Sequence, residues 1–107
     1  MSKQVLDQIR LFEDAMVAWR HDLHRHPEVG FEEHRTADMV ARTLAGYGYE
    51  VHRHIGKTGV VGRLKVGAST RSIGLRADMD ALPIEETNQF SHRSTVEGRM
   101  HACGHDG

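Results

Sequence analysis

Apolar side chains recur at every third or fourth position through the first part of the chain. They are Val5, Ile9, Phe12, Met16, Trp19 and Leu23. This spacing forms one apolar stripe on a helix, so it predicts a helix over residues 3–26. Ser2 is placed to cap the start of that helix. Pro27 ends it, because proline lacks an amide hydrogen and also pushes His26 out of helical geometry.

A second apolar stripe predicts a helix from about Glu32 to Gly46. The positions that share its face are Thr36, Val40, Thr43, Leu44 and Tyr47. Gly46 and Gly48 follow as residues that tolerate the left-handed backbone with which helices often end.

The period then changes to two, which is typical of strands. Alternation predicts strands over residues 49–55, 60–66 and 72–77. The connections, residues 56–59 and 67–70, are short and rich in glycine, so neighbouring strands should be antiparallel. Two helices followed by strands predict an α/β or α+β fold, and we take α/β as the class.

Residues 81–99 form a polar stretch without periodicity. Irregular segments of this length, about 19 residues, are usually functional or disordered in compact domains. The last residue, Gly107, closes no predicted element. We therefore interpret residues 1–107 as the N-terminal portion of a larger domain.

Composition restricts the class of protein. The chain has 107 residues, 38% of them hydrophobic and 27% charged, which favours a small soluble domain over disorder. The net charge is -1 with no basic face, so nucleic acid is not an expected partner. No apolar run reaches the roughly 18 residues of a membrane span. A single cysteine fits a reducing cytoplasm.

The chain holds nine histidines, and two of them flank its one cysteine in His-Ala-Cys-Gly-His-Asp, residues 101–106. A thiolate and an imidazole two positions apart can converge on one ion, and they are ligand types that zinc and later transition metals prefer. Asp106 could bind the ion or orient His105. The alternative is a structural Cys103 with incidental histidines, and the spacing alone leaves both interpretations open.

Asp78 and Asp80 follow the third predicted strand, at the end where α/β folds place their ligands. In a continuing strand both carboxylates would face the same side, where they could bind a cation. The alternative is a polar strand end before a turn at Pro83.

The bend between the two helices has a structural interpretation. His24 lies in the last helical turn, where a cation complements the helix dipole, and Pro27 and Gly30 shape the bend. Metal binding by the histidines of this region is not favoured.

Three segments together resemble a known family. Residues 23–33 (Leu-His-Arg-His-Pro-Glu-Val-Gly-Phe-Glu-Glu), 76–83 (Arg-Ala-Asp-Met-Asp-Ala-Leu-Pro) and 101–107 (His-Ala-Cys-Gly-His-Asp-Gly) occur in this order. They are similar to the signatures of the hippurate hydrolase, N-acyl-L-amino acid amidohydrolase and indole-acetyl-amino-acid hydrolase branch. That branch lies within the aminoacylase and carboxypeptidase G group of metallopeptidases, and the resemblance covers essentially the whole chain.

The resemblance implies a site. Cys103 and His105 would be ligands of a centre with two divalent ions, which could be zinc, manganese, nickel or cobalt. Asp80 would orient that centre without binding directly, and Asp78 stands where other relatives place a ligand histidine. The implied fold is the N-terminal part of a zinc-peptidase-like catalytic domain, with two helices followed by a mixed sheet.

The resemblance also implies an activity, the hydrolysis of an N-acyl amino acid or a dipeptide-like molecule into a carboxylic acid and an amino acid. Relatives supply the catalytic Glu-Glu pair and further ligands after this region, together with a lid domain that helps them dimerise. Glu85 and Glu86 precede the metal motif, so they are not that pair. We therefore expect a homo-oligomeric parent enzyme and an inactive 107-residue chain that binds at most one ion weakly.

Two other functions stay open at this stage. The chain could be a non-catalytic module that binds metal or associates with itself through exposed strand edges. A thiol enzyme with Cys103 as nucleophile and His105 or His101 as base is disfavoured, because such close neighbours rarely reach proton-transfer geometry. The acyl group, the amino acid and the metal are not determined by the sequence.

Overall fold

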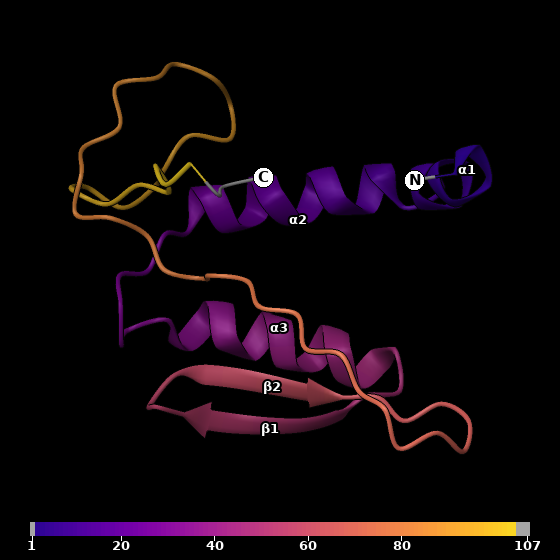
Figure 1. Ribbon diagram of the computed structural model, residues 1–107. Coiled ribbons are helices and arrows are strands. Elements are labelled where there is room, and N and C mark those ends of the chain that lie inside the picture. Colours follow the sequence, from indigo (N-terminus) through magenta and orange to yellow (C-terminus); the bar gives the residue numbers. More distant parts are fainter. Residues whose placement is uncertain (1, 105–107) are drawn as a thin grey trace. The chain divides into compact units, whose positions relative to one another are not determined.

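The computed structural model describes residues 2–104 (Figure 1). Its elements are α1 (Lys3–Arg10), α2 (Glu13–Arg25), α3 (His34–Gly46), β1 (Glu50–Ile55) and β2 (Gly59–Arg63). They fall into two compact units: residues 28–81 form the second unit, and the stretches before and after it form the first. The α/β class is confirmed. None of the described helices is long and apolar enough to cross a membrane.

The start of the first predicted helix is confirmed, but its continuity is wrong. The Ser2 hydroxyl accepts the Val5 amide at 3.4 Å and caps α1. The helix then breaks, because the amides of Leu11 and Phe12 bond to carbonyls three residues back, at 3.2 and 2.9 Å, in place of the usual four. This tightened turn separates α1 from α2.

The end of α2 follows the prediction made from proline. His26 leaves helical geometry with φ -123° and ψ 61°, and the next residue is Pro27. The second predicted helix is also confirmed as α3, which begins two residues later than expected. It is followed by Gly48 at φ 89°, the left-handed backbone expected after a helix.

The predicted hairpin is confirmed. β1 and β2 are antiparallel, with Glu50 opposite Arg63, and the pairing is irregular between His52 and Ile55. α3 packs closely against this hairpin at Gly62, where an added Cβ would lie only 3.0 Å from a methyl group of Leu44. A side chain at this position would require Leu44 to shift by a few tenths of an ångström.

The third predicted strand is wrong. Among the described residues, β2 ends at Arg63 and the following stretch, residues 64–80, contains no strand. Ile73 and Leu75 are 88% and 92% exposed. Alternation makes a segment suitable for a sheet, but a strand also needs neighbouring amides and carbonyls, and none of the described chain pairs with this stretch. The mixed sheet is therefore replaced by a two-stranded antiparallel one.

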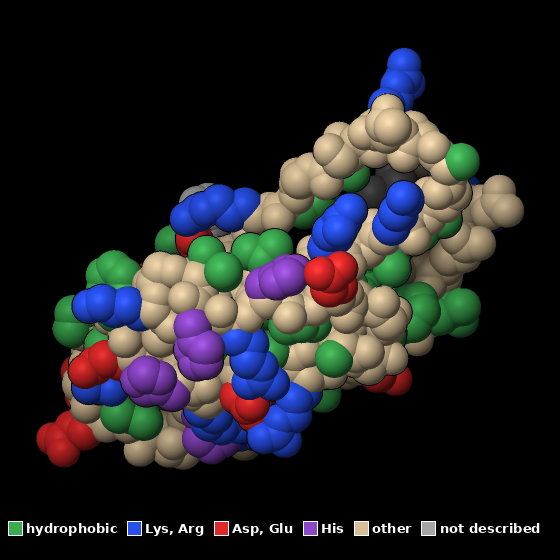
Figure 2. Space-filling view, turned by 90° about the horizontal axis from the view of Figure 1, so that it is seen from below, with side chains coloured by type: hydrophobic (Ala, Val, Ile, Leu, Met, Phe, Trp, Pro, Cys, Tyr) green, Lys and Arg blue, Asp and Glu red, His purple; other side chains and the backbone are tan. Residues whose placement is uncertain are grey.

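The face shown in Figure 2 carries interspersed positive, negative and histidine side chains. Green apolar groups lie between them. Several large apolar residues of the described chain are exposed, among them Leu11 at 81% and Val66 at 80%. The chain therefore leaves apolar side chains of both units in contact with solvent.

Candidate metal centre

Asp80 lies in the second unit, at a point where the irregular chain becomes fixed. The next residue, Ala81, donates its amide to the Glu28 carbonyl at 2.7 Å, and it forms a parallel bridge with Val29. A Cβ added at Gly30 would lie 3.9 Å from the Asp80 carboxylate. The bend after α2 therefore holds the backbone beside Asp80, while the side chain of Asp80 stays exposed.

Glu28 also caps α3. Its carboxylate accepts the amides of Arg35 and Thr36 at 3.0 and 2.6 Å and the Thr36 hydroxyl at 2.7 Å. Burial alone would raise the pKa of this carboxyl, but the hydrogen bonds from Thr36 and Arg35 outweigh burial and lower it. Glu28 is therefore ionised near neutral pH, and its charge lies at the positive end of the helix dipole.

Glu33, at the start of α3, is a buried carboxylate of this unit. It accepts the Phe31 amide at 3.0 Å and a hydrogen bond from the Thr58 hydroxyl in the hairpin turn. Phe31 has a positive φ of 66°, an uncommon backbone for a bulky residue, and Glu33 stabilises that turn. The structural interpretation of the segment over residues 23–33 thus rests on Glu28 and Glu33.

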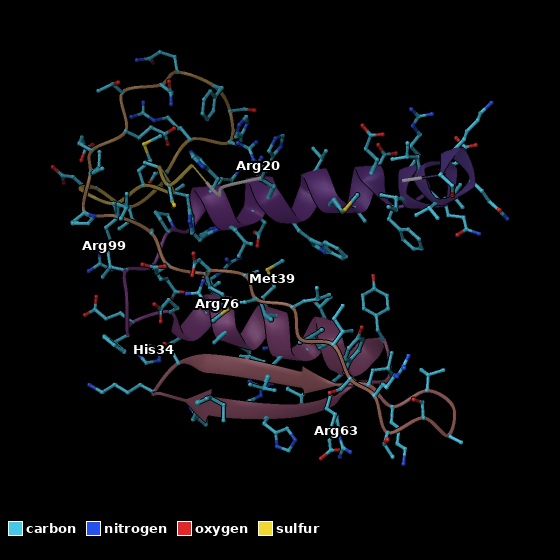
Figure 3. The ribbon with its side chains drawn as sticks, viewed as in Figure 1. Arg20, His34, Met39, Arg63, Arg76 and Arg99 are labelled. Atoms are coloured by element: carbon cyan, nitrogen blue, oxygen red, sulfur yellow. The ribbon has the colours of Figure 1, made fainter. Side chains whose placement is uncertain are left out.

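Asp78 is placed differently from Asp80. The Asp78 carboxylate pairs with the guanidinium of Arg76, labelled in Figure 3, at 2.7 Å. The strand that would have aligned the two aspartates on one side is not formed. The expectation that both carboxylates face the same side therefore has no strand to support it.

Cys103 lies in the first unit, after an irregular stretch that covers residues 82–100 and whose ends pair. Leu82 and Met100 form an antiparallel bridge with hydrogen bonds of 2.9 and 3.0 Å between their backbones. The side chain of Cys103 is exposed. The other predicted ligand, His105, and the neighbouring Asp106 lie outside the described residues.

Glu86 is the main polar centre of this stretch. It is only 4% exposed. Its carboxylate accepts hydrogen bonds from His24 Nε2 at 2.9 Å, from the Asn88 amide group at 3.0 Å and from the Ser94 backbone amide. Burial alone would raise the pKa of this carboxyl, but the bonds from Asn88, His24 and Ser94 outweigh burial and lower it from 4.5 to about 2.

His24 therefore has a role that the sequence interpretation missed. Its side chain is buried and meets Glu86, whereas the sequence analysis assigned His24 only a favourable interaction with the helix dipole at the end of α2. Nearby, the rings of His21, His92 and Phe90 form a stack, with centroids 3.8 and 3.9 Å apart. Burial, followed by the charge of His21, lowers the pKa of His92.

The donor set fits a metal in chemistry but is incomplete over residues 2–104. Thiol and carboxylate groups are metal ligands, and both Cys103 and Asp80 are accessible. No three or more His, Cys, Asp or Glu side chains of the described residues lie together in a way that could hold an ion. Cys103 belongs to the first unit and Asp80 to the second.

Two buried carboxylates, Glu33 and Glu86, were not identified as important by the sequence analysis. Each lies in a Glu-Glu pair, at residues 32–33 and 85–86, and only the second member of each pair is buried. A pair of acidic residues beside a proline-containing bend was the available signal. Spacing cannot show which of the two side chains turns inward, because that depends on the donors that surround it.

Comparisons with known proteins agree with the predicted resemblance. The profile described as peptidase family M20/M25/M40 matches residues 74–107. The hippurate hydrolase of Campylobacter jejuni is 58% identical over 82% of this chain and 23% of its own length. The N-acyl-L-amino acid amidohydrolase of Geobacillus stearothermophilus is 44% identical over 98% of this chain and 28% of its own.

A solved structure also matches. The YXEP protein of Bacillus subtilis, described as a dinuclear metal-binding peptidase of the M20 family, is 40% identical, with a TM-score of 0.82. The match covers 91% of this chain and 28% of that one. The chain thus spans about a quarter of the length of the relatives it matches. The resemblance to M20 amidohydrolases and peptidases is confirmed, and the enzymes it resembles are hydrolases.

Proposed function

We propose that residues 1–107 form the N-terminal part of the catalytic domain of a metal-dependent amidohydrolase of the M20 type. The observation that carries this proposal is the family match over residues 74–107, which spans both the Asp78–Asp80 segment and the Cys103 motif. The high identity to a hippurate hydrolase, 58%, supports the amide-cleaving branch.

In this proposal Cys103 and His105 are ligands of a centre with two divalent ions. Asp80 orients the centre, since a carboxylate next to a ligand fixes its tautomer and direction. The bound ions would supply a water of lowered pKa and would polarise the amide carbonyl. The backbone bond between Ala81 and Glu28 supports the role of Asp80, because it fixes the chain where Asp80 is presented.

The proposed substrate is an N-acyl amino acid, cleaved to a carboxylic acid and an amino acid. The names of two similar proteins, a hippurate hydrolase and an N-acyl-L-amino acid amidohydrolase, support this class of substrate. We further propose a cytoplasmic and homo-oligomeric parent enzyme. The cytoplasm keeps cysteine reduced, as a metal-binding thiolate requires.

A chimera tests the function. The aligned region of the Campylobacter jejuni hippurate hydrolase is replaced by this chain, and hydrolysis of hippurate is measured with added Mn²⁺ or Zn²⁺. We expect activity from the chimera, and a loss of at least about a hundredfold in kcat/KM for Cys103→Ser and His105→Ala. Asp80→Asn should lose about tenfold to a hundredfold.

Glu97→Gln serves as the matched control for Asp80→Asn. It also replaces an exposed carboxylate by an amide, but Glu97 lies outside the proposed metal centre. It should leave hydrolysis within about twofold of the parent chimera. A chimera that folds, binds metal and keeps full activity after Cys103→Ser would contradict the proposal. So would turnover of hippurate by the purified 107-residue chain, which we propose to be inactive without further ligands.

A second candidate function is self-association, and one observation favours it. Ile73 and Leu75 are alternating apolar residues, 88% and 92% exposed, in a stretch whose backbone has no strand partner among the described residues. An unpaired segment of this kind can add a strand from another molecule. Sedimentation at increasing protein concentration separates this candidate from a monomeric chain.

A further inference from the structure

The irregular stretch over residues 82–100 is held by polar contacts, together with the ring stack of Phe90 and His92. Besides the Leu82 and Met100 bridge, several of its hydrogen bonds converge on one buried carboxylate, that of Glu86. Glu86 was assigned no role by its sequence motif, and it does not belong to the proposed ligand set. Its hydrogen-bond partners indicate a role in fixing the chain that leads to Cys103.

A chain of hydrogen bonds leads from Glu86 toward the proposed metal ligand. The Glu86 carboxylate accepts the Ser94 amide. The Ser94 hydroxyl in turn has the carbonyls of Arg99, at 2.7 Å, and Val96, at 2.9 Å, as acceptors for its one hydrogen, and the Arg99 contact is the shorter. Met100 follows directly, and its amide donates to the Leu82 carbonyl at 3.0 Å. Arg99 is labelled in Figure 3 in the segment that leads to Cys103.

A second anchor keeps the same stretch on α2. Thr95 donates both its amide, at 2.8 Å, and its hydroxyl, at 2.6 Å, to the carbonyl of Arg25. His24, the preceding residue of α2, holds the Glu86 carboxylate itself. The last turn of α2 therefore fixes both Glu86 and the residue that follows Ser94.

We propose that Glu86 is a positioning residue, which acts through Ser94 and Arg99 to hold the Met100–Cys103 segment in place for metal binding. This inference deepens the proposed function. It rests on that function only in taking a metal ion as the ligand of Cys103. Its structural part concerns the segment alone. A buried carboxylate suits this task, because its charge makes each accepted hydrogen bond stronger than a bond between neutral groups.

The first test measures amide hydrogen exchange in the 107-residue chain. Two variants interrupt this chain of hydrogen bonds. Glu86→Gln removes the charge of the carboxylate that accepts the Ser94 amide. Ser94→Ala removes the hydroxyl that contacts the Arg99 carbonyl and leaves the Glu86 carboxylate in place. We expect the Met100 amide to exchange at least about tenfold faster in both. Glu97→Gln, which removes an exposed carboxylate of the same segment, should leave that exchange unchanged.

The second test adds Co²⁺ to the chimera with the Campylobacter jejuni hippurate hydrolase, which provides the further ligands, and measures the thiolate-to-cobalt charge-transfer absorption. Cys103→Ser should abolish this band. In Glu86→Gln and Ser94→Ala the apparent affinity for Co²⁺ should fall about tenfold, the size expected when a ligand loses its support. A role confined to general stability would leave the band of the remaining folded protein unchanged in position and affinity.

The outcomes separate the two proposals. An unsubstituted chimera that shows no cobalt band counts against the proposed metal function, while exchange at Met100 in the 107-residue chain still decides the positioning role. Unchanged exchange in both variants overturns that role. A change in Glu86→Gln alone overturns it as well, because the route through Ser94 is what is proposed. An unaltered cobalt affinity in variants with faster exchange also overturns it.

Discussion

Two irregular stretches lead to the candidate site residues, and they are held in different ways. In residues 64–80, apolar side chains such as Ile73 and Leu75 are exposed, and the backbone is fixed just beyond the end of the stretch, where Ala81 donates to the Glu28 carbonyl. Residues 82–100 are equally without strands or helices, but they surround the buried carboxylate of Glu86.

The difference shows that regular secondary structure is not what fixes these segments. Residues 64–80 have the alternation of a strand but no partner strand among the described residues, so this pattern adds no sheet pairing to the second unit. The other has no pattern, but its polar groups find buried partners. A buried carboxylate with three donors determines the path of the chain around it, because leaving any of those groups unsatisfied is costly.

The largest expected effect is that of Glu86→Ala. The substitution removes the buried acceptor of both the His24 ring and the Ser94 amide, so the free energy of unfolding should fall by about 3 kcal/mol. Urea denaturation followed by circular dichroism measures this change. Glu97→Ala should stay within about 0.5 kcal/mol of the wild type. Similar values for the two variants would remove the contrast between the stretches.

A smaller effect is expected for Glu28→Ala in the second unit. The α3 amides of Arg35 and Thr36 lose their acceptor, which should cost about 1 to 2 kcal/mol, as for other helix caps. Faster exchange of these two amides would report the loss directly. Glu28→Gln keeps one acceptor oxygen and should lie between the wild type and the alanine variant; equal exchange in all three proteins would contradict the capping role.

Acid should act on the first unit through Glu86. The pKa of this carboxyl is lowered in the folded chain from 4.5 to about 2, so the folded state prefers the ionised form. A lowered pKa gives stability that is fully present above about pH 4.5 and is lost as the pH falls toward 2. The Glu28 pKa is lowered too, so the second unit should lose stability in the same direction.

This pH dependence is measured from the Ser94 amide chemical shift and from urea denaturation between pH 5 and roughly pH 2. The shift should follow the Glu86 titration, and stability should decline over the same range. In Glu86→Gln the shift should no longer titrate, and the decline should be shallower. An unchanged decline in that variant would show that other carboxyls dominate the acid response.

The smallest effect on stability is expected for Leu75→Ser. The side chain is 92% exposed, so its replacement should change the free energy of unfolding by less than about 0.5 kcal/mol. The same change should reduce any self-association seen by sedimentation, since it removes exposed apolar surface. A destabilisation of more than about 1 kcal/mol would show that residues 64–80 are packed more firmly than their exposure indicates.

Local signals in the sequence predicted much of the fold. Ser2, Pro27 and Gly48 marked helix ends correctly, because each acts on its own backbone or on neighbours within a few positions. The hairpin of β1 and β2 was predicted for the same reason. The break after Arg10 carries no proline or glycine, so nothing in the residue types indicated it.

The remaining errors concern partners that lie far away in the sequence. Alternation around Ile73 and Leu75 described a possible strand, but pairing depends on another segment and not on the pattern itself. His24 and Glu86 were not connected, since neither residue type nor spacing shows that two distant groups share a buried site. The site prediction for Cys103, His105 and Asp80 came from the family resemblance and stays a prediction.

The pairing of His24 with Glu86 has a consequence for the order of folding. The two residues are 62 positions apart, and Thr95 and Arg25 are 70 apart. The second unit, in contrast, is one continuous stretch, residues 28–81. Contacts between distant residues pay a larger loop-closure entropy, which is reduced once the intervening chain is compact. During synthesis, residues 28–81 can therefore fold first, and the network around Glu86 forms last, so its loss should mainly speed unfolding.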